Sequence, residues 1–206
     1  QLYDYYQRIL RECPIQILYV GSAQPEEIAE KLSGLLASLD RNPMELPPQT
    51  AFDLPGGENI TETMDVSQAK LCMGFTTPIT NRDADFPAMQ VMNVIFGSGM
   101  TSKLFMNVRE KLSLCYYASS GLEKMKGLVL VSSGIEFANY QRAVDEIMAQ
   151  MEAMRQGCWE DWEVQAARSS LRNALRSMED SGSALEDFAV GQAATDSDET
   201  IHGLMA

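Results

Sequence analysis

Arg109 and Tyr116 are the two side chains whose types and spacing suit recognition chemistry in this sequence. They stand seven residues apart in "VREKLSLCYY", where a helical pattern of apolar residues gives way to a strand. A guanidinium fork and a phenolic hydroxyl at one junction could converge on a carbonyl or a carboxylate. Spacing alone favours a structural role instead, in which Arg109 pairs with a surface acid and Tyr116 caps the core.

The histidine and cysteine content bears on metal chemistry. A catalytic zinc takes about three protein ligands, usually with two histidines among them, and His202 is the single histidine of the chain. The inverted zinc motif His-x-x-Glu-His needs two histidines and cannot be present. The cysteines lie far apart in sequence, which predicts reduced core thiols rather than a zinc site or a disulfide framework. We therefore predict no metal ligands here.

Other motifs that could carry catalysis are better explained by structure. Gly97-Ser98-Gly99 follows a helical pattern and lacks the lysine and hydroxyl of a phosphate-binding loop, so it is expected to end that helix. A serine nucleophile needs a base, normally histidine, and none is suitably placed. We therefore assign no catalytic residue.

Composition excludes several classes of partner. The 206 residues carry a formal net charge of -13, which would repel a phosphate backbone, so no nucleic acid partner is expected. No run of eighteen apolar residues occurs, and we predict no membrane span. The sequence starts at Gln1 without a methionine, so it is expected to be a fragment or a processed form. A cytoplasmic location is expected separately from this.

The apolar pattern divides the chain into a short first part and a longer second part. Helices are predicted at 2–11 and 25–39, with a buried strand at 15–20 between them. Residues 40–58 hold four prolines and a Gly-Gly pair with little periodicity, which is typical of a linker. The predicted organisation is a strand-helix segment over 1–39, a linker over 40–58 and a domain over 59–206.

The longer part alternates strand pairs with helices. Strands are predicted at 59–66, 69–76, 115–122 and 128–135, and helices at 86–96, 101–112, 140–154, 164–178 and 183–194. Two strand pairs with helices between and after them indicate an α+β fold. We expect an antiparallel (mixed) sheet with helices packed on one face.

One segment resembles a known family. "VIFGSGMTSKLFMNVREKLSLCYYASSG" followed by "GLVLVSSGIE" is similar to the pitrilysin and insulinase-type zinc metallopeptidases, which include the mitochondrial processing peptidase. The resemblance implies a processing-peptidase-like domain of the non-zinc, C-terminal type. "IQILYVGSAQPEEIAEKL" resembles the strand and helix that close the family's preceding domain. The resemblance also implies a last strand and helix in this domain. We expect the sequence to stop before them, and residues 14–39 are a hypothetical substitute for them.

The resemblance also implies a division of labour. Zinc is expected in a separate domain of the same chain or in a partner subunit, with no cofactor in this chain, which should be inactive alone. Arg109 and Tyr116 would bind a peptide or unfolded protein substrate, with Tyr117 as a possible accessory residue. The alternative is a proteolytically inactive family member that acts as a structural or assembly subunit.

Overall fold

The computed structural model describes residues 1–45, 57–195 and 197–205. The described residues form two compact units. One unit contains residues 57–174 together with 205, and the other contains residues 1–45 together with 175–195 and 197–204. Most of the linker expected at 40–58 lies outside the described residues.

The first of these units is built on an antiparallel sheet. In the described part of the chain it has three strands in the order β1-β3-β2, with β1 at Ala69–Thr76, β2 at Cys115–Glu123 and β3 at Leu128–Ile135. The hairpin between β2 and β3 forms as predicted, and the central strand β3 aligns Ile135 with both Ala69 and Cys115. From Val129 to Ser133, residues in β3 alternate between buried and exposed positions, so one face of the sheet is buried.

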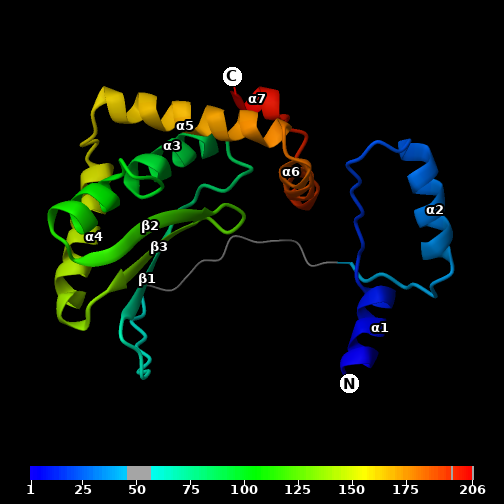
Figure 1. The fold of residues 1–206 in the computed structure, drawn as a ribbon, viewed down its shortest axis with the longest axis horizontal. Helices are drawn as coiled ribbons and strands as arrows, with labels where there is room; N and C mark the ends of the chain where they lie inside the picture. The colour runs from blue at the N-terminus through cyan, green and yellow to red at the C-terminus, as the bar shows by residue number, and fades with distance from the viewer. Residues whose placement is uncertain (46–56, 196, 206) are drawn as a thin grey trace. The chain divides into compact units, whose positions relative to one another are not determined.

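Helices cover that buried face (Figure 1). Helix α3 runs from Phe86 to Phe96, a π-helix η1 from Leu104 to Lys111, a short 3-10 turn η2 from Phe137 to Asn139, α4 from Tyr140 to Arg155 and α5 from Asp161 to Glu179. α3 and η1 pack on β2, and α4 packs on both of them. Completely buried side chains at their contacts include Phe96, Leu104, Val108, Val131 and Ile147. The predicted α+β fold is confirmed.

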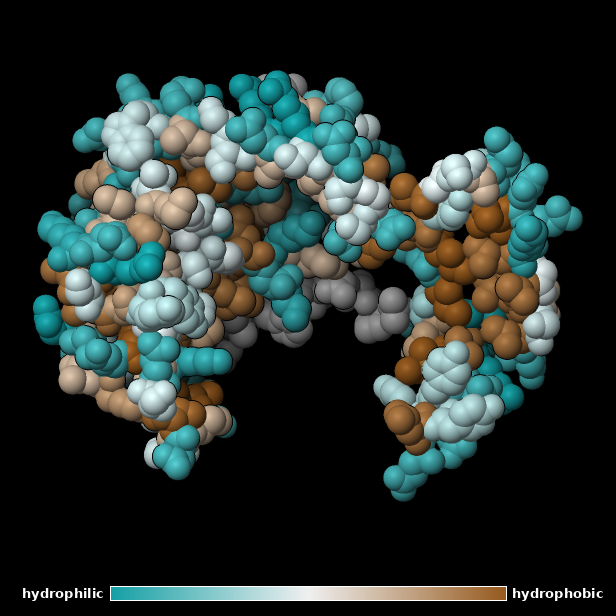
Figure 2. All heavy atoms as spheres, viewed as in Figure 1, coloured by the Kyte–Doolittle hydropathy of each residue, from teal (hydrophilic) through white to brown (hydrophobic). Residues whose placement is uncertain are grey.

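The second unit contains helices α1 at Leu2–Glu12, α2 at Pro25–Ala37 and α6 at Gly182–Thr195, and α7 at Ile201–Met205 except for its last residue. The end of α5, from residue 175, also belongs to this unit. Neither α1 nor α2 has a buried residue. Leu2 is 83% exposed and Leu35 is 67% exposed, and Figure 2 shows hydrophobic side chains on the surface of α2. Across the described ranges, no helix combines the length and the apolar character needed to cross a bilayer.

Two predicted strands are wrong. Residues 15–20 and 59–66 are described but form no strand, and neither range pairs with the sheet. Residues 14–39 therefore do not supply a last strand to the sheet. An apolar or alternating run fixes which face of a strand would be buried, but a strand forms only where a neighbouring strand accepts its backbone hydrogen bonds.

Candidate functional site

The candidate site is the junction between η1 and β2. Leu104 and Val108, four residues apart in η1, are fully buried and fix this helix against the core. The helix ends in a tight reversal at Ser113, whose φ is +51°. The amides of Ser113 and Leu114 donate to the carbonyls of Arg109 and Val108, each at 3.0 Å. The reversal leads directly into β2, so the backbone positions Arg109 and the first residues of β2 at one corner.

Arg109 lies at the solvent edge of this corner. Its side chain is 40% exposed, and its guanidinium stacks over the ring of Phe105 at 4.6 Å from the centroid. Nη1 also forms a long ion pair of 3.6 Å with the Glu110 carboxylate. Within the described residues, Arg109 makes no other ion pair or side-chain hydrogen bond, and a guanidinium has five N–H donors. The head group is therefore held in place while most of its donors stay available.

Tyr116 is presented to solvent by an irregularity in β2. The strand register pairs Cys115 with Ile135 and Tyr117 with Gly134, so Tyr116 is the extra residue of a β-bulge. Its side chain is 76% exposed. The structural alternative in which Tyr116 caps the core is therefore wrong, whereas the one in which Arg109 pairs with a surface acid describes its contact with Glu110.

Tyr117 occupies a different environment from Tyr116. It is 37% exposed, and its hydroxyl lies 3.2 Å from the Ser132 hydroxyl on the neighbouring strand. Its backbone carbonyl accepts a 2.7 Å hydrogen bond from the Ser133 hydroxyl. Both ends of the residue are thus tied to β3, and Tyr117 has less freedom to meet a ligand than Tyr116.

Arg109 lies close enough to β2 to affect the pKa of Cys115. Burial raises the pKa of the Cys115 thiol, while a hydrogen bond with Ser133 and the positive charge of Arg109 act in the opposite direction. The charge of Arg109 therefore reaches the residue immediately before Tyr116. No described contact joins the Arg109 guanidinium to the Tyr116 hydroxyl, so the two groups share a corner without being bonded to each other.

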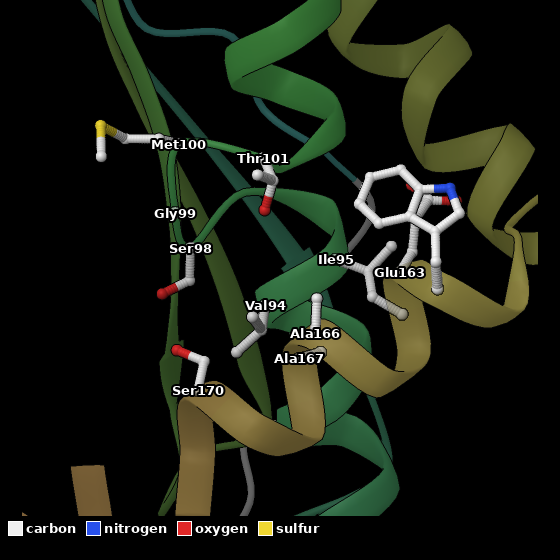
Figure 3. A pocket seen from close by; sticks show the side chains of 11 residues that line it. Val94, Ile95, Ser98, Gly99, Met100, Thr101, Glu163, Ala166, Ala167 and Ser170 are labelled. Atoms are coloured by element: carbon white, nitrogen blue, oxygen red, sulfur yellow. The ribbon is translucent and has the colours of Figure 1, made fainter. Parts of the chain in front are cut away.

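A pocket of about 250 Å³ lies between the end of α3, the loop at 98–101 and the first turns of α5 (Figure 3). Its walls are mainly apolar, and the hydroxyls of Ser98 and Ser170 point toward each other at its rim. Glu163 is the one charged residue among those that line it, and its carboxylate already pairs with Lys103 at 3.1 Å. The pocket has hydroxyls but no uncommitted charge, so Arg109 is the stronger group for carbonyl recognition.

The described residues contain no cluster of side chains that could bind a metal ion. No three His, Cys, Asp or Glu side chains among them lie close enough together to hold an ion. His202 lies in the unit that contains α7, and its Nδ1 is 3.3 Å from the Glu179 carboxylate. The residues present do not fit a zinc site, and no step of the chemistry below is assigned to a metal in this chain.

The features of the site differ in how far the sequence could have indicated them. The stacking of Arg109 on Phe105 is consistent with a four-residue spacing on a helix, and sequence could have suggested it. The bulge at Tyr116 and the π-helical winding of η1 have no local pattern that predicts them. The Lys103–Glu163 ion pair joins residues sixty positions apart, and no local sequence pattern indicates such a contact.

Comparisons of sequence identify relatives along the whole chain. The family model described as the peptidase M16 inactive domain matches residues 1–171. The probable inactive metalloprotease YmfF of Bacillus subtilis is 34% identical over 206 residues, which cover 100% of this chain and 48% of that protein. An uncharacterized zinc protease of Rickettsia bellii is 26% identical over 76% of this chain and 37% of its own length. The chain thus spans about half the length of these curated relatives or less.

Solved structures also include proteins with a fold similar to that of this chain. A conserved protein from Enterococcus faecalis aligns with a TM-score of 0.75 and 29% identity, over 99% of this chain and 51% of that one. A peptidase M16 inactive domain from Pseudomonas fluorescens aligns with a TM-score of 0.55 and 21% identity, over 72% of this chain and 36% of that one. At 21% identity, the second likeness concerns the fold alone.

Proposed function

This chain belongs to the family of the peptidase M16 inactive domain, and from that premise we propose that it binds the peptide substrate of a zinc-dependent metallopeptidase without cutting it. The zinc would be supplied by a separate domain of the same protein or by a partner subunit. The observation that carries the proposal is that a stacked, partly exposed Arg109 and a 76% exposed Tyr116 lie at one corner of the fold.

The chemistry of this corner suits a peptide backbone. Peptide carbonyls are acceptors, and both the guanidinium and the phenol donate hydrogen bonds. A charge-assisted bond from Arg109 to a carbonyl is worth about 1.5–3 kcal/mol, and a neutral bond from Tyr116 about 0.5–1.5 kcal/mol. Because every residue of a substrate offers the same carbonyl, such contacts hold unfolded chains with little sequence preference.

The contribution to rate would be positioning. A substrate segment held at two points enters a separate zinc site in a restricted orientation, which lowers the entropic part of the barrier. Phe105 supports this role because its ring fixes the plane of the guanidinium before substrate arrives. Arg109 and Tyr116 would therefore be substrate-binding residues, and no group of this chain would act on the scissile bond.

The direct test uses the full-length protein that contains this chain. Arg109→Ala and Tyr116→Phe are each expected to lower kcat/KM on an unstructured peptide, and Arg109→Lys is expected to recover only part of the loss because lysine cannot present a planar fork. Arg142→Ala, a change at an exposed arginine of α4, is the matched control. Unchanged kcat/KM in both site variants would contradict the proposal.

A structural or assembly subunit is the second candidate, and one observation favours it. The relative from Bacillus subtilis carries the name probable inactive metalloprotease, and this chain is 34% identical to it. The discriminating observation is whether the full-length gene or its neighbour encodes His-x-x-Glu-His with a downstream glutamate. If neither gene does, proteolysis is lost and the subunit role is favoured.

A further inference from the structure

The bulge in β2 decides which side chain faces the core. Ile135 of β3 is 1% exposed and lies on the helix-covered face of the sheet. In a regular strand, the residue before Tyr117 would oppose Ile135 and would point to the same buried face. The bulge gives that position to Cys115, which packs against the core, and leaves Tyr116 exposed. The exposure of Tyr116 therefore depends on the bulge staying where it is.

Both ends of the bulged segment are fixed. On one side, Leu114 is 2% exposed and its amide donates to the Val108 carbonyl. On the other side, Tyr117 is opposite Gly134, and its hydroxyl reaches along β3 to the Ser132 hydroxyl at 3.2 Å. Two residues, Cys115 and Tyr116, must then fill a space that a regular strand fills with one. The extra residue has no place in the ladder and turns outward.

Gly134 is what allows Tyr117 to lie flat on the sheet. A Cβ atom at position 134 would come within 2.7 Å of Cε1 and 3.0 Å of Cδ1 of the Tyr117 ring. Distances this short are not tolerated between carbon atoms, so any side chain there would lift the ring away from β3. Gly121 of β2 is different, because a Cβ atom there would meet no atom within 4 Å.

From these contacts we propose that Tyr117 is a positioning residue: its ring, seated on Gly134 and bonded to Ser132, holds the bulge that presents Tyr116 to substrate. This role rests on the proposed function of Tyr116. Tyr117 itself makes no substrate contact. Displacing its ring releases one end of the bulge, and Tyr116 and Cys115 then compete for the position opposite Ile135.

The test is a double-mutant cycle in the full-length protein, with equilibrium binding of an unstructured peptide as one readout. Gly134→Ala and Tyr117→Ala are each expected to weaken binding about tenfold, since small misplacements of a binding group are costly. In the Tyr117→Ala background, Gly134→Ala should add less than about twofold, because neighbours that act through one contact are not additive. Gly121→Ala is the matched control and should bind like the parent.

The second readout is the alkylation rate of Cys115, which does not depend on peptide. Loss of the bulge moves Cys115 out of its half-buried position, so Gly134→Ala should speed its alkylation several-fold while the melting temperature stays close to that of Gly121→Ala. Tyr117→Phe, which keeps the ring and loses the bond to Ser132, should fall between parent and Gly134→Ala and gives a milder variant if Gly134→Ala folds poorly.

The outcomes separate this role from the proposed function. If Tyr116→Phe weakens binding but Gly134→Ala and Tyr117→Ala change neither binding nor Cys115 alkylation, the positioning role is overturned and the substrate role of Tyr116 stands. Additive losses in the double variant would also overturn it. If Arg109→Ala and Tyr116→Phe leave peptide binding unchanged, the proposed function is wrong, and the alkylation rate of Cys115 does not alter that conclusion.

Discussion

The amide of Leu114 donates a 3.0 Å hydrogen bond to the carbonyl of Val108, which closes the end of η1 onto the start of β2. Arg109 lies inside the segment that this bond closes, and Tyr116 lies two residues after Leu114. Because both Leu114 and Val108 are buried, the bond lies in the core and is protected from water. The corner that carries the candidate site is thus anchored to the core through Val108 and Leu114.

Ser113 gives the first prediction. Its φ of +51° lies in the left-handed region, where a side chain costs energy and glycine does not. Ser113→Val should lower the free energy of unfolding by about 1–2 kcal/mol, because a β-branched residue fits this conformation poorly. Ser113→Gly should not lower it. Urea denaturation of both variants measures the difference, and equal stabilities would show that the reversal is not strained.

Gly97 gives the second prediction, at the contact between the end of α3 and β2. A Cβ atom there would meet the hydroxyl of Ser120 and, at 2.7 Å, its backbone nitrogen. The Ser120 amide donates to the Gly97 carbonyl at 3.0 Å, so the two backbones cannot separate cheaply. Gly97→Ala should destabilise the protein by about 1–3 kcal/mol, as overpacked cores do.

Gly74→Ala is the control for that experiment, because a Cβ atom at position 74 would only reach ordinary contact with Leu130 at 3.7 Å. Thermal unfolding of the two variants is the measurement. A Gly97→Ala variant as stable as Gly74→Ala would contradict the close contact between the end of α3 and β2.

The Lys103–Glu163 ion pair gives the third prediction. Its side chains are 14% and 11% exposed, and it joins the residue before η1 to the first turn of α5 at 3.1 Å. Removing one partner leaves a charge with poor access to water, so Lys103→Met should cost about 3 kcal/mol of stability. Arg155→Met breaks the exposed pair with Glu152 and should cost less than about 1 kcal/mol. Similar losses in both variants would contradict the burial of the first pair.

Cys115 gives the fourth prediction, which concerns pH. Burial raises the pKa of its thiol, so at neutral pH it should react with iodoacetamide more slowly than the exposed Cys72 and Cys158. The positive charge of Arg109 lowers the pKa of Cys115, so Arg109→Ala should slow that reaction further. Mass spectrometry of alkylated peptides over a pH series measures each rate. A faster reaction at Cys115 than at Cys72 would contradict the burial.

The raised pKa of Cys115 also sets the sign of a pH effect on stability. The folded protein favours the neutral thiol more than the unfolded chain does. The contribution to stability is therefore fully present below the ordinary thiol pKa and is lost as pH rises through the higher pKa of the folded state. Denaturation midpoints should fall on the alkaline side, and Cys115→Ser should reduce the alkaline part of that fall.

The helices α3, η1 and α4 and the β2–β3 hairpin were predicted from the sequence, because their apolar periods match the residues that the core buries. Helices α1 and α2 were also predicted, although neither has a buried residue. Prediction failed at residues 15–20 and 59–66, where the pattern of a strand is present but no neighbouring strand pairs with it. Sequence placed Arg109 and Tyr116 at one junction. It could not give the exposure of Tyr116, which arises from one extra residue in β2 and from the absence of a side chain at Gly134.

The central claim is that Arg109 and Tyr116 hold a peptide, and equilibrium binding tests it independently of cleavage. The measurement is the Kd of a fluorescent unstructured peptide for the full-length protein, its Arg109→Ala and Tyr116→Phe variants, and the controls Arg142→Ala and Tyr140→Phe. We expect Kd to rise about 10–100-fold for Arg109→Ala and about 2–10-fold for Tyr116→Phe, with both controls unchanged. Site variants that bind as tightly as the controls would contradict it.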